Sequence, residues 1–272
     1  MTQDPAAPHG AAIIDTSKPH PARMYDWFLG GKDNYPVDEE MARQLLTVDA
    51  RGRDMARVNR AFMHRAIRWL SAEGVRQYLD VGTGIPTEPN LHQIAQGVAP
   101  DSRIVYCDND PIVLAHAAAL LRSTPAGATE YIQADARDPE LILERAGKVL
   151  DFDQPIALSM LALLHFVGDE DGAYDLVGKL VEKLAPGSYL VLSHVTGDFD
   201  PEGAAKAAAM YKARGLTLRP RSRNELAAFF DGLDLVEPGV SLTAEWHPEL
   251  GEPVQVQGDD PIPGWAAVGR KR

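Results

Sequence analysis

The sequence predicts an α/β fold built on a mostly parallel, doubly wound sheet with helices on both faces. Short apolar runs recur after Gly74, and roughly 15 to 30 residues with helical patterns separate one run from the next. The runs lack strict alternation of apolar and polar residues, which is typical of strands buried on both faces. The expected strands are Gln77–Val81, Arg103–Cys107, Thr129–Gln133, Pro155–Met160 and Tyr189–Ser193.

The residues before these strands predict a helical N-terminal cap. Residues 1–20 lack periodicity, and we expect them to form a flexible tail. Helical spacing covers Pro21–Leu29, Val37–Leu46 and about Asp54–Ser71, with a polar glycine turn between the first two helices. The chain therefore divides into a tail at 1–20, a cap at 21–73 and a sheet domain at 74–272.

Helix caps and late strands complete the predicted domain. Asp110-Pro111 supplies an N-cap and a first-turn proline for a helix that runs to about Arg122. Ser222–Glu225 has the spacing of a capping box. Beyond it, Leu235–Val236 begins another strand, and Gly264–Val268 is expected to close the sheet as an antiparallel strand.

Composition excludes several classes of protein. The 272 residues carry 27 basic and 39 acidic side chains, a net charge of -12, so we expect no nucleic-acid partner. Cys107 is the single cysteine and cannot form an internal disulfide or a multi-thiolate zinc site, which favours a reducing cytoplasm. It lies in an apolar run, where a buried, inert thiol is expected.

Neither Ala11–Ile14 nor Ile156–Val167 is long enough to direct export or cross a bilayer, so no membrane association is predicted.

A glycine turn after the first strand, leading into a helix that is expected to begin near Glu88, is the most informative motif. Gly82 and Gly84 allow the backbone to turn sharply and to approach a ligand closely, although a tight turn without a ligand has the same pattern. Asp108 ends the next strand, and Asp135 follows the third. Ligands of doubly wound sheets bind outside the carboxyl ends of the strands, so these residues are expected to meet in one crevice.

The residues around the turn favour S-adenosylmethionine over a dinucleotide. A dinucleotide motif has a third glycine where this sequence has Thr87, preceded by Pro86. Asp80, just before the turn, suits a cationic sulfonium amino acid better than a diphosphate.

Four segments together resemble a bacterial family of S-adenosylmethionine-dependent methyltransferases, class I, formerly catalogued as a domain of unknown function. They are Ser17–Tyr35 (SKPHPARMYDWFLGGKDNY), Gly82–Thr87 (GTGIPT), Val105–Pro111 (VYCDNDP) and Leu164–Val167 (LHFV). The resemblance extends from about Asp15 to Arg270. It implies a Rossmann-like, mostly parallel seven-stranded sheet with an N-terminal cap, S-adenosyl-L-methionine as cofactor and S-adenosyl-L-homocysteine as product.

The resemblance also assigns cofactor-binding roles by position. Asp108 would bind the ribose and Asp135 the adenine amino group, and Asp80 would lie near the methionine ammonium, in contact directly or through water. The remaining candidates in the sheet domain are Gly82, Thr83, Gly84, Asn109, Ala136 and Ser159.

The cap contributes further candidates. The turn Gly30–Tyr35, with Arg23, Tyr25 and Asp26, could fold over the crevice as a lid, and Lys32 or Arg23 could then pair with the methionine carboxylate. A surface connection between two helices with solvated charges is the alternative.

Two histidines are candidates for a catalytic base. His165 follows the fourth strand, and His194 ends the fifth. A hydrogen-bonded packing histidine and a substrate-binding histidine are the alternatives, and the sequence does not separate the two residues.

The other clusters predict ordinary structure. Arg219-Pro-Arg221-Ser-Arg223 is expected to be a solvated loop, and Trp27, Trp246 and Trp265 are expected to pack. No spacing predicts a metal site.

The resulting hypothesis is a methyltransferase acting on a small molecule, with a non-catalytic S-adenosylmethionine sensor or a nicotinamide-dependent oxidoreductase as alternatives.

Overall fold

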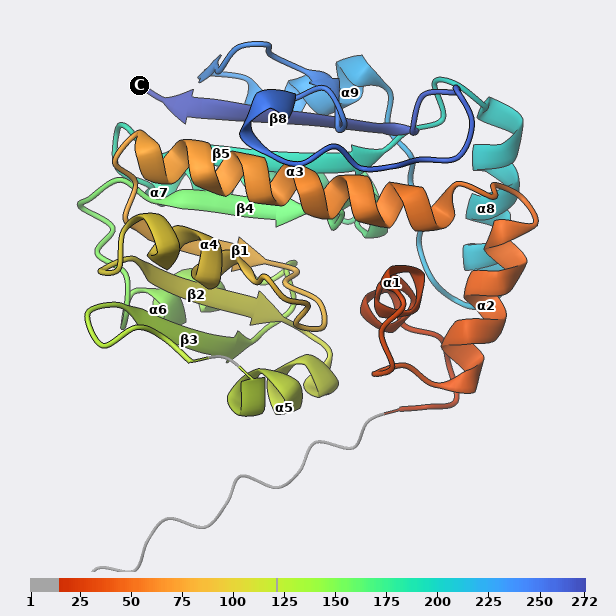
Figure 1. Ribbon diagram of the computed structural model, residues 1–272, viewed down its shortest axis with the longest axis horizontal. Helices are drawn as coiled ribbons and strands as arrows, with labels where there is room; N and C mark the ends of the chain where they lie inside the picture. The colour runs from red at the N-terminus through yellow and green to blue at the C-terminus, as the bar shows by residue number, and fades with distance from the viewer. Residues whose placement is uncertain (1–14, 121) are drawn as a thin grey trace, which may run out of the picture.

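The computed structural model describes residues 15–120 and 122–272, and its centre is a mixed eight-stranded sheet in the order β3-β2-β1-β4-β5-β8-β6, with β7 paired to β8 (Figure 1). The strands are β1 (Gln77–Val81), β2 (Arg103–Asp108), β3 (Ala128–Gln133), β4 (Ala157–Leu161), β5 (Tyr189–Val195), β6 (Leu233–Leu235), β7 (Ser241–Leu242) and β8 (Gly264–Lys271). The first five strands pair in parallel, and β8 pairs antiparallel with β5, β6 and β7. The predicted doubly wound sheet with an antiparallel closing strand is confirmed.

Three sequence-based expectations about the elements were wrong in detail. The sheet has eight strands rather than seven, because β7 is a two-residue strand too short to leave a pattern in the sequence. The strand expected to begin at Leu235 ends there. The helix expected near Glu88 begins at Leu91, because Asn90 and Gln93 form a capping box that fixes its first turn.

The helices within the described residues are α1 (Pro21–Leu29), α2 (Pro36–Leu46), α3 (Gly52–Ala72), α4 (Leu91–Val98), α5 (Pro111–Leu120), α6 (Pro139–Ala146), α7 (Ala173–Lys183), α8 (Pro201–Ala213) and α9 (Arg223–Ala227). Of the predicted tail, residues 1–14 lie outside the described part of the chain. The described part is tied to the cap, since Arg23 donates to the carbonyls of Asp15 and Lys18 and the His20 amide donates to Asp38. The expected end of α5 near Arg122 falls beyond residue 121, which is not described.

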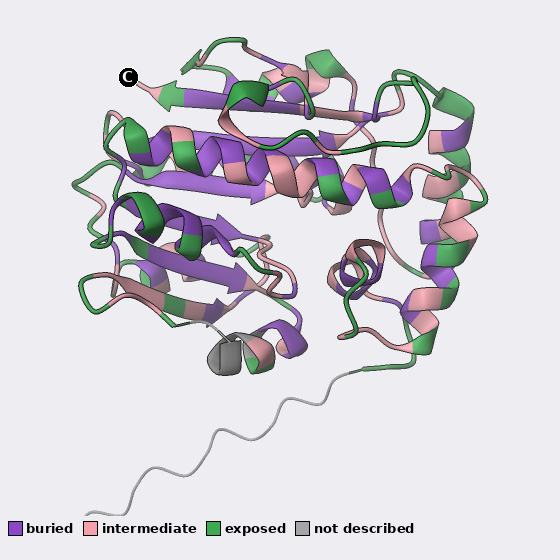
Figure 2. Cartoon of the chain, viewed as in Figure 1, coloured by how far each residue is buried: buried purple, intermediate pink, exposed green. Residues whose placement is uncertain are grey.

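Alternation along the strands builds two cores. Tyr78 and Ile104 pack with α3 and α4 on one face, whereas Leu79 and Val105 pack with α6 and α7 on the other. The central strands are accordingly buried along their length (Figure 2). No helix in the described ranges has the length and apolarity needed to cross a membrane.

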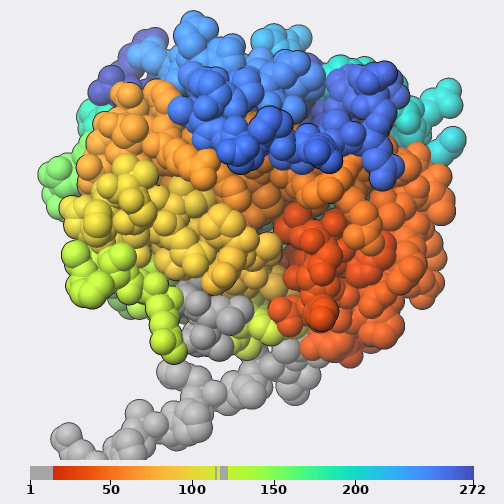
Figure 3. Space-filling model, in the orientation of Figure 1, coloured from red at the N-terminus to blue at the C-terminus, as the bar shows by residue number. Residues whose placement is uncertain are grey.

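The cap helices lie at the carboxyl ends of the parallel strands. In Figure 1, α1, α2 and α8 stand beyond the arrowheads of β1, β2 and β4, while α3 runs across the sheet. In the space-filling view the red and orange N-terminal residues adjoin both the yellow residues of the β1 region and the blue C-terminal residues (Figure 3). The cap thus encloses the edge of the sheet where ligands of such folds bind.

Candidate active site

The turn after β1 needs glycine at two positions for different reasons. Gly82 and Gly84 have φ of +76° and +68°, a region that L-residues rarely adopt. A Cβ on Gly82 would also lie 2.7 Å from Cδ1 of Leu163, whereas the space around Gly84 is open. Leu163 follows β4, so the glycine turn packs directly against the loop that carries His165.

Asp108 fastens this turn to the end of β2. Its Oδ2 accepts the Gly84 amide at 2.8 Å, and its Oδ1 accepts the Asp110 amide at 3.0 Å. Burial raises the pKa of Asp108, and the two amide donors oppose that shift. Each carboxylate oxygen keeps a further lone pair, so Asp108 is able to accept ligand hydroxyls as well.

Asp135, after β3, is more exposed and already has a basic neighbour. It accepts the Arg137 amide at 2.9 Å and Arg137 Nε at 3.0 Å. Partial burial opposes ionisation, yet these donors hold the pKa of Asp135 below its ordinary value. Asn109 Nδ2 lies 3.5 Å from Asp135 Oδ2, which places the ends of β2 and β3 side by side.

Asp80 is a buried carboxylate with no basic side chain in ion-pair contact among the described residues. It is 9% exposed, and Ser159 Oγ donates to its Oδ1 at 2.5 Å. Burial raises the pKa of Asp80 to about 6, although Ser159 and the more distant Arg60 oppose the shift. The hydrogen bonds offset only part of the cost of burying this carboxylate. Asp80 therefore favours a cationic ligand, because a cation stabilises the ionised form.

One cavity of about 510 Å³ joins these groups, a volume within the ~300–1,000 Å³ range of small-molecule sites. Most of the sequence-predicted candidates line it. They are Tyr25, Asp80, Gly82, Thr83, Gly84, Asp108, Asn109, Asp135, Ala136, His165 and His194.

Three predicted binding residues do not line the cavity. Arg23 is buried, with Nε 3.4 Å from Asp110 Oδ2, so its charge holds the cap against the start of α5. Lys32 is exposed in the turn after α1. Ser159 contacts Asp80 instead of the cavity. The structure therefore places neither Arg23 nor Lys32 where its side chain could bind a methionine carboxylate in the cavity.

The two histidines lie 5.2 Å apart between ring centroids but have different surroundings. His194 Nε2 accepts from Arg221 at 3.0 Å, because a guanidinium only donates, and Nδ1 therefore donates to the Val195 carbonyl at 2.7 Å. Burial lowers the pKa of His194 to about 4. With both nitrogens engaged, His194 has no free atom to serve as a base.

His165 has its nitrogens free. It is 7% exposed, its Nδ1 is buried, and within the described part of the chain neither ring nitrogen has a hydrogen-bond partner. Burial, and then the neighbouring His194 and Arg221, lower the pKa of His165 well below its ordinary value. The neutral imidazole can accept a hydrogen bond or a proton from a ligand.

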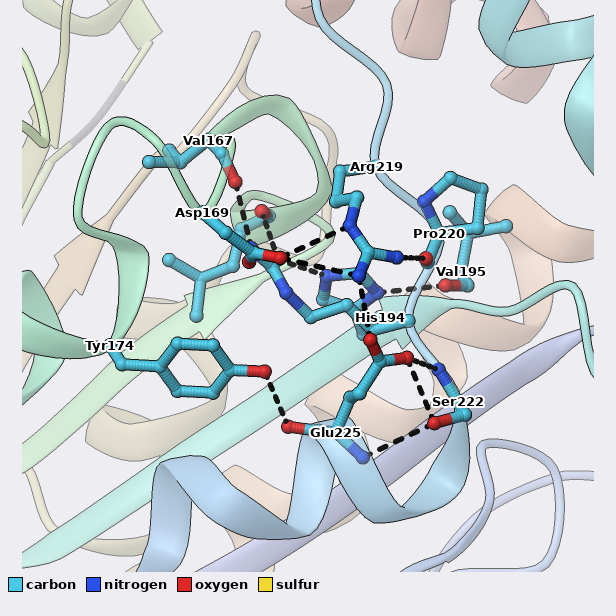
Figure 4. Close-up of polar contacts among 11 residues, drawn as sticks. Val167, Asp169, Tyr174, His194, Val195, Arg219, Pro220, Ser222 and Glu225 are labelled. Carbon is cyan, nitrogen blue, oxygen red and sulfur yellow. Dashed lines mark hydrogen bonds and ion pairs between the residues drawn. The ribbon is translucent and has the colours of Figure 1, made fainter.

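Arg221 contradicts the predicted solvated loop. Its side chain is fully buried, and it donates to the carbonyls of Leu164 and Val167 as well as to His194. Asp169 accepts from the same guanidinium at 2.7 Å. It also accepts from Nε of Arg219 at 3.2 Å (Figure 4). Arg221 thus holds the turn that carries His165.

Two further cavity residues were missed in the sequence because they lie on the long helix α3. Asn59 donates to the Tyr25 hydroxyl at 2.9 Å and accepts from Ser193 Oγ. Arg60 donates to the carbonyls of Thr87 and Pro89, which anchors the segment after the glycine turn. The sequence signal that could have identified both residues is their position as adjacent polar residues on an amphipathic helix.

Among residues 15–120 and 122–272, no group of three or more His, Cys, Asp or Glu side chains is arranged to hold a metal ion.

Comparison with known proteins agrees with this geometry. A crystal structure of a DUF574 family protein from Streptomyces avermitilis is 45% identical, with a TM-score of 0.90 over 96% of this chain and 100% of that one. A proposed methyltransferase from Thermobifida fusca is 38% identical, with a TM-score of 0.86 over 95% and 97% of the two chains. A search of curated proteins gave no match.

A more distant structure bears on the fold alone. An S-adenosylmethionine-dependent methyltransferase from Anabaena variabilis is 16% identical, with a TM-score of 0.50 over 72% of this chain and 77% of that one.

The family model described as S-adenosyl methyltransferase matches residues 8–272. The chain therefore belongs to the S-adenosyl methyltransferase family and is an S-adenosylmethionine-dependent methyltransferase.

Proposed function

We propose that the protein methylates a small-molecule acceptor inside this cavity, with S-adenosyl-L-methionine lying across the carboxyl ends of β1, β2 and β3. The convergence of Asp80, Asp108 and Asp135 from three strands on one cavity carries the proposal. A small acceptor fits a cavity covered by the cap, and the net charge of -12 disfavours nucleic acid.

The chemistry of the acids fits the parts of this cofactor. Asp108 has lone pairs free for the two ribose hydroxyls, and Asp135 with Ala136 lies beside it to receive the adenine amino group. Asp80 supplies the negative charge that the ammonium and sulfonium require. Gly84 leaves open space where a Cβ would stand.

His165 is the residue that we propose receives the acceptor's proton. When bound, S-adenosyl-L-methionine supplies a methyl group activated by its sulfonium. The protein then needs to align the acceptor and exclude water, for which the cap is suited. His165 lines the cavity with free nitrogens, whereas those of His194 are engaged.

We also propose that the protein works in the reducing cytoplasm. Cys107 is buried, and burial raises the pKa of its thiol to about 12, so it is not a reactive group. A protein whose single thiol is buried and unreactive gains no disulfide from an oxidising compartment, which favours a reducing one.

Calorimetry with S-adenosylmethionine, S-adenosylhomocysteine and NAD tests the cofactor assignment. We expect the first two to bind and NAD not to bind; absence of binding by both sulfur compounds at millimolar concentration would refute the assignment. Transfer of an isotopically labelled methyl group into small molecules of a cell extract tests catalysis, and labelling confined to macromolecules would refute a small acceptor.

A further inference from the structure

The part of the cavity under the cap is an apolar chamber, which we define by Met24, Phe28, Leu45, Phe166, Tyr211 and Leu216. These side chains come from α1, α2, α8 and the turns after β4 and α8, and they pack in one cluster. The cluster consists of apolar and aromatic side chains, and all six residues lie outside the segment from Asp80 to Asp135 that carries the three acids.

From this chamber we propose that the methyl acceptor is an uncharged hydroxyl compound with an apolar body, held with its hydroxyl at His165. This inference rests on the proposed methyl transfer and adds the class of acceptor. It predicts that carboxylates and phosphates of similar shape are rejected.

The charges of the cavity wall support rejection of anions. The lysine and arginine side chains among its described lining residues are Arg51, Arg60 and Arg137, and each is engaged. Arg51 pairs with Asp49, Arg60 donates to two carbonyls, and Arg137 pairs with Asp135. An anionic acceptor would lose its hydration without gaining a free cation, which is costly.

The polar atoms of the wall single out His165. The Tyr25 hydroxyl donates to the Ala56 carbonyl and accepts from Asn59, which in turn accepts from Ser193. Several buried polar atoms in the described residues lack a partner, and Nδ1 of His165 is the one that belongs to a residue lining the cavity. An unpaired buried nitrogen is stabilised by a ligand that donates to it.

The reaction balances with this residue as proton acceptor. The methyl–sulfur bond breaks with its electron pair left on sulfur, and an oxygen lone pair of the acceptor forms the new carbon–oxygen bond. The hydroxyl proton passes to His165 and then to solvent. A hydroxyl fits a neutral imidazole of low pKa, because the oxygen becomes strongly acidic as it gains the methyl group.

Binding of matched probes to the protein saturated with S-adenosylhomocysteine tests the proposal at neutral pH. We expect 2-naphthol to bind at least about tenfold more tightly than 2-naphthoate, since only the second is charged. Equal or tighter binding of 2-naphthoate, or binding of neither probe at millimolar concentration, would overturn the proposal. S-adenosylhomocysteine binding is measured first, so its failure identifies a failure of the proposed function instead.

Two variants sharpen the test. Leu45→Arg places a cation at the partly exposed side of the chamber and is expected to reduce the preference for 2-naphthol by about tenfold. Val98→Arg, at an exposed position outside the cavity, is the control and should leave the preference unchanged. An unchanged preference in Leu45→Arg that still binds S-adenosylhomocysteine would overturn the chamber assignment.

The hydroxyl contact is tested with 2-methylnaphthalene, which has the same body without the donor. His165→Ala should weaken 2-naphthol by about tenfold and leave 2-methylnaphthalene within about twofold. Equal weakening of both probes would show that His165 only packs, and would overturn its role.

Discussion

The two halves of the cavity are built in opposite ways. The half that we propose binds the cofactor, the cofactor half, takes its acids from the ends of three neighbouring parallel strands, within Asp80 to Arg137. Backbone amides hold Asp108 and Asp135 in place, and the Ser159 hydroxyl holds Asp80. The half that we propose binds the acceptor, the acceptor half, is apolar and gathers side chains from Met24 to Leu218. Sheet topology thus fixes the position of the cofactor half, whereas packing of the cap determines the shape of the acceptor half.

If the halves are separate in function, His165→Ala should have the largest effect, and it should act on turnover. We expect methyl transfer to fall about 100-fold or more, because a positioned proton acceptor contributes ~10²–10⁴-fold. Affinity for S-adenosylhomocysteine should stay within about twofold. Label transfer into a cell extract and calorimetry measure the two quantities, and His165→Asn, whose amide oxygen accepts a hydrogen bond but cannot take a proton, should not recover the rate. A large loss of affinity would break the distinction between the halves.

Asp108→Ala should show the reverse pattern. Loss of charge-assisted hydrogen bonds is expected to weaken S-adenosylmethionine about 30- to 100-fold, as measured by calorimetry. Asp138→Ala is a matched control, since this exposed aspartate caps α6 outside the cavity. It should cost about 1 kcal/mol of unfolding free energy and leave affinity unchanged. Equal losses of affinity in both variants would contradict the assignment of Asp108.

Gly82→Ala tests whether the cofactor half is as rigidly built as its contacts indicate. The positive φ and the contact with Leu163 predict a loss of about 1–3 kcal/mol in the free energy of unfolding by denaturant titration. Gly97→Ala, in α4 with open space around it, should be neutral or stabilising by up to about 1 kcal/mol. Stability unchanged in Gly82→Ala would show that the turn adapts.

The smallest expected effect is a pH dependence confined to the cofactor half. The pKa of Asp80 is raised to about 6, so the group is ionised above that pH and protonated below it. Affinity for the cationic cofactor should fall by up to about tenfold per pH unit below about pH 6. Calorimetry from neutral to acid pH measures this slope. Asp80→Asn should flatten it, whereas Asp175→Asn, on an exposed position of α7, should retain it.

Sequence patterns predicted well where the acids of the cofactor half lie. Continuous apolar runs are diagnostic of strands buried on both faces, and parallel topology brings their carboxyl ends to one edge. Knowing the strands was therefore enough to predict that Asp80, Asp108 and Asp135 line one cavity, as the structure shows.

The acceptor half and the buried charges were not predictable in the same way. Arg221 and Arg23 have charges that resemble surface charges in the sequence, and their burial depends on carbonyl and carboxylate partners far along the chain. Similarly, His165 follows one apolar strand and His194 lies at the end of another, and only the buried Arg221 distinguishes them, by occupying a nitrogen of His194. Tertiary partners, not local pattern, decide such roles.

The placement of β8 between β5 and β6 also has a consequence for synthesis on the ribosome. Residues 264–271 occupy the position next to β5 although they follow the other seven strands of the described residues. Until they emerge from the exit tunnel, a nascent chain carries β5 with one unpaired edge, which is open to pairing with other chains. The described strand that is translated latest is thus the one that closes the gap between β5 and β6.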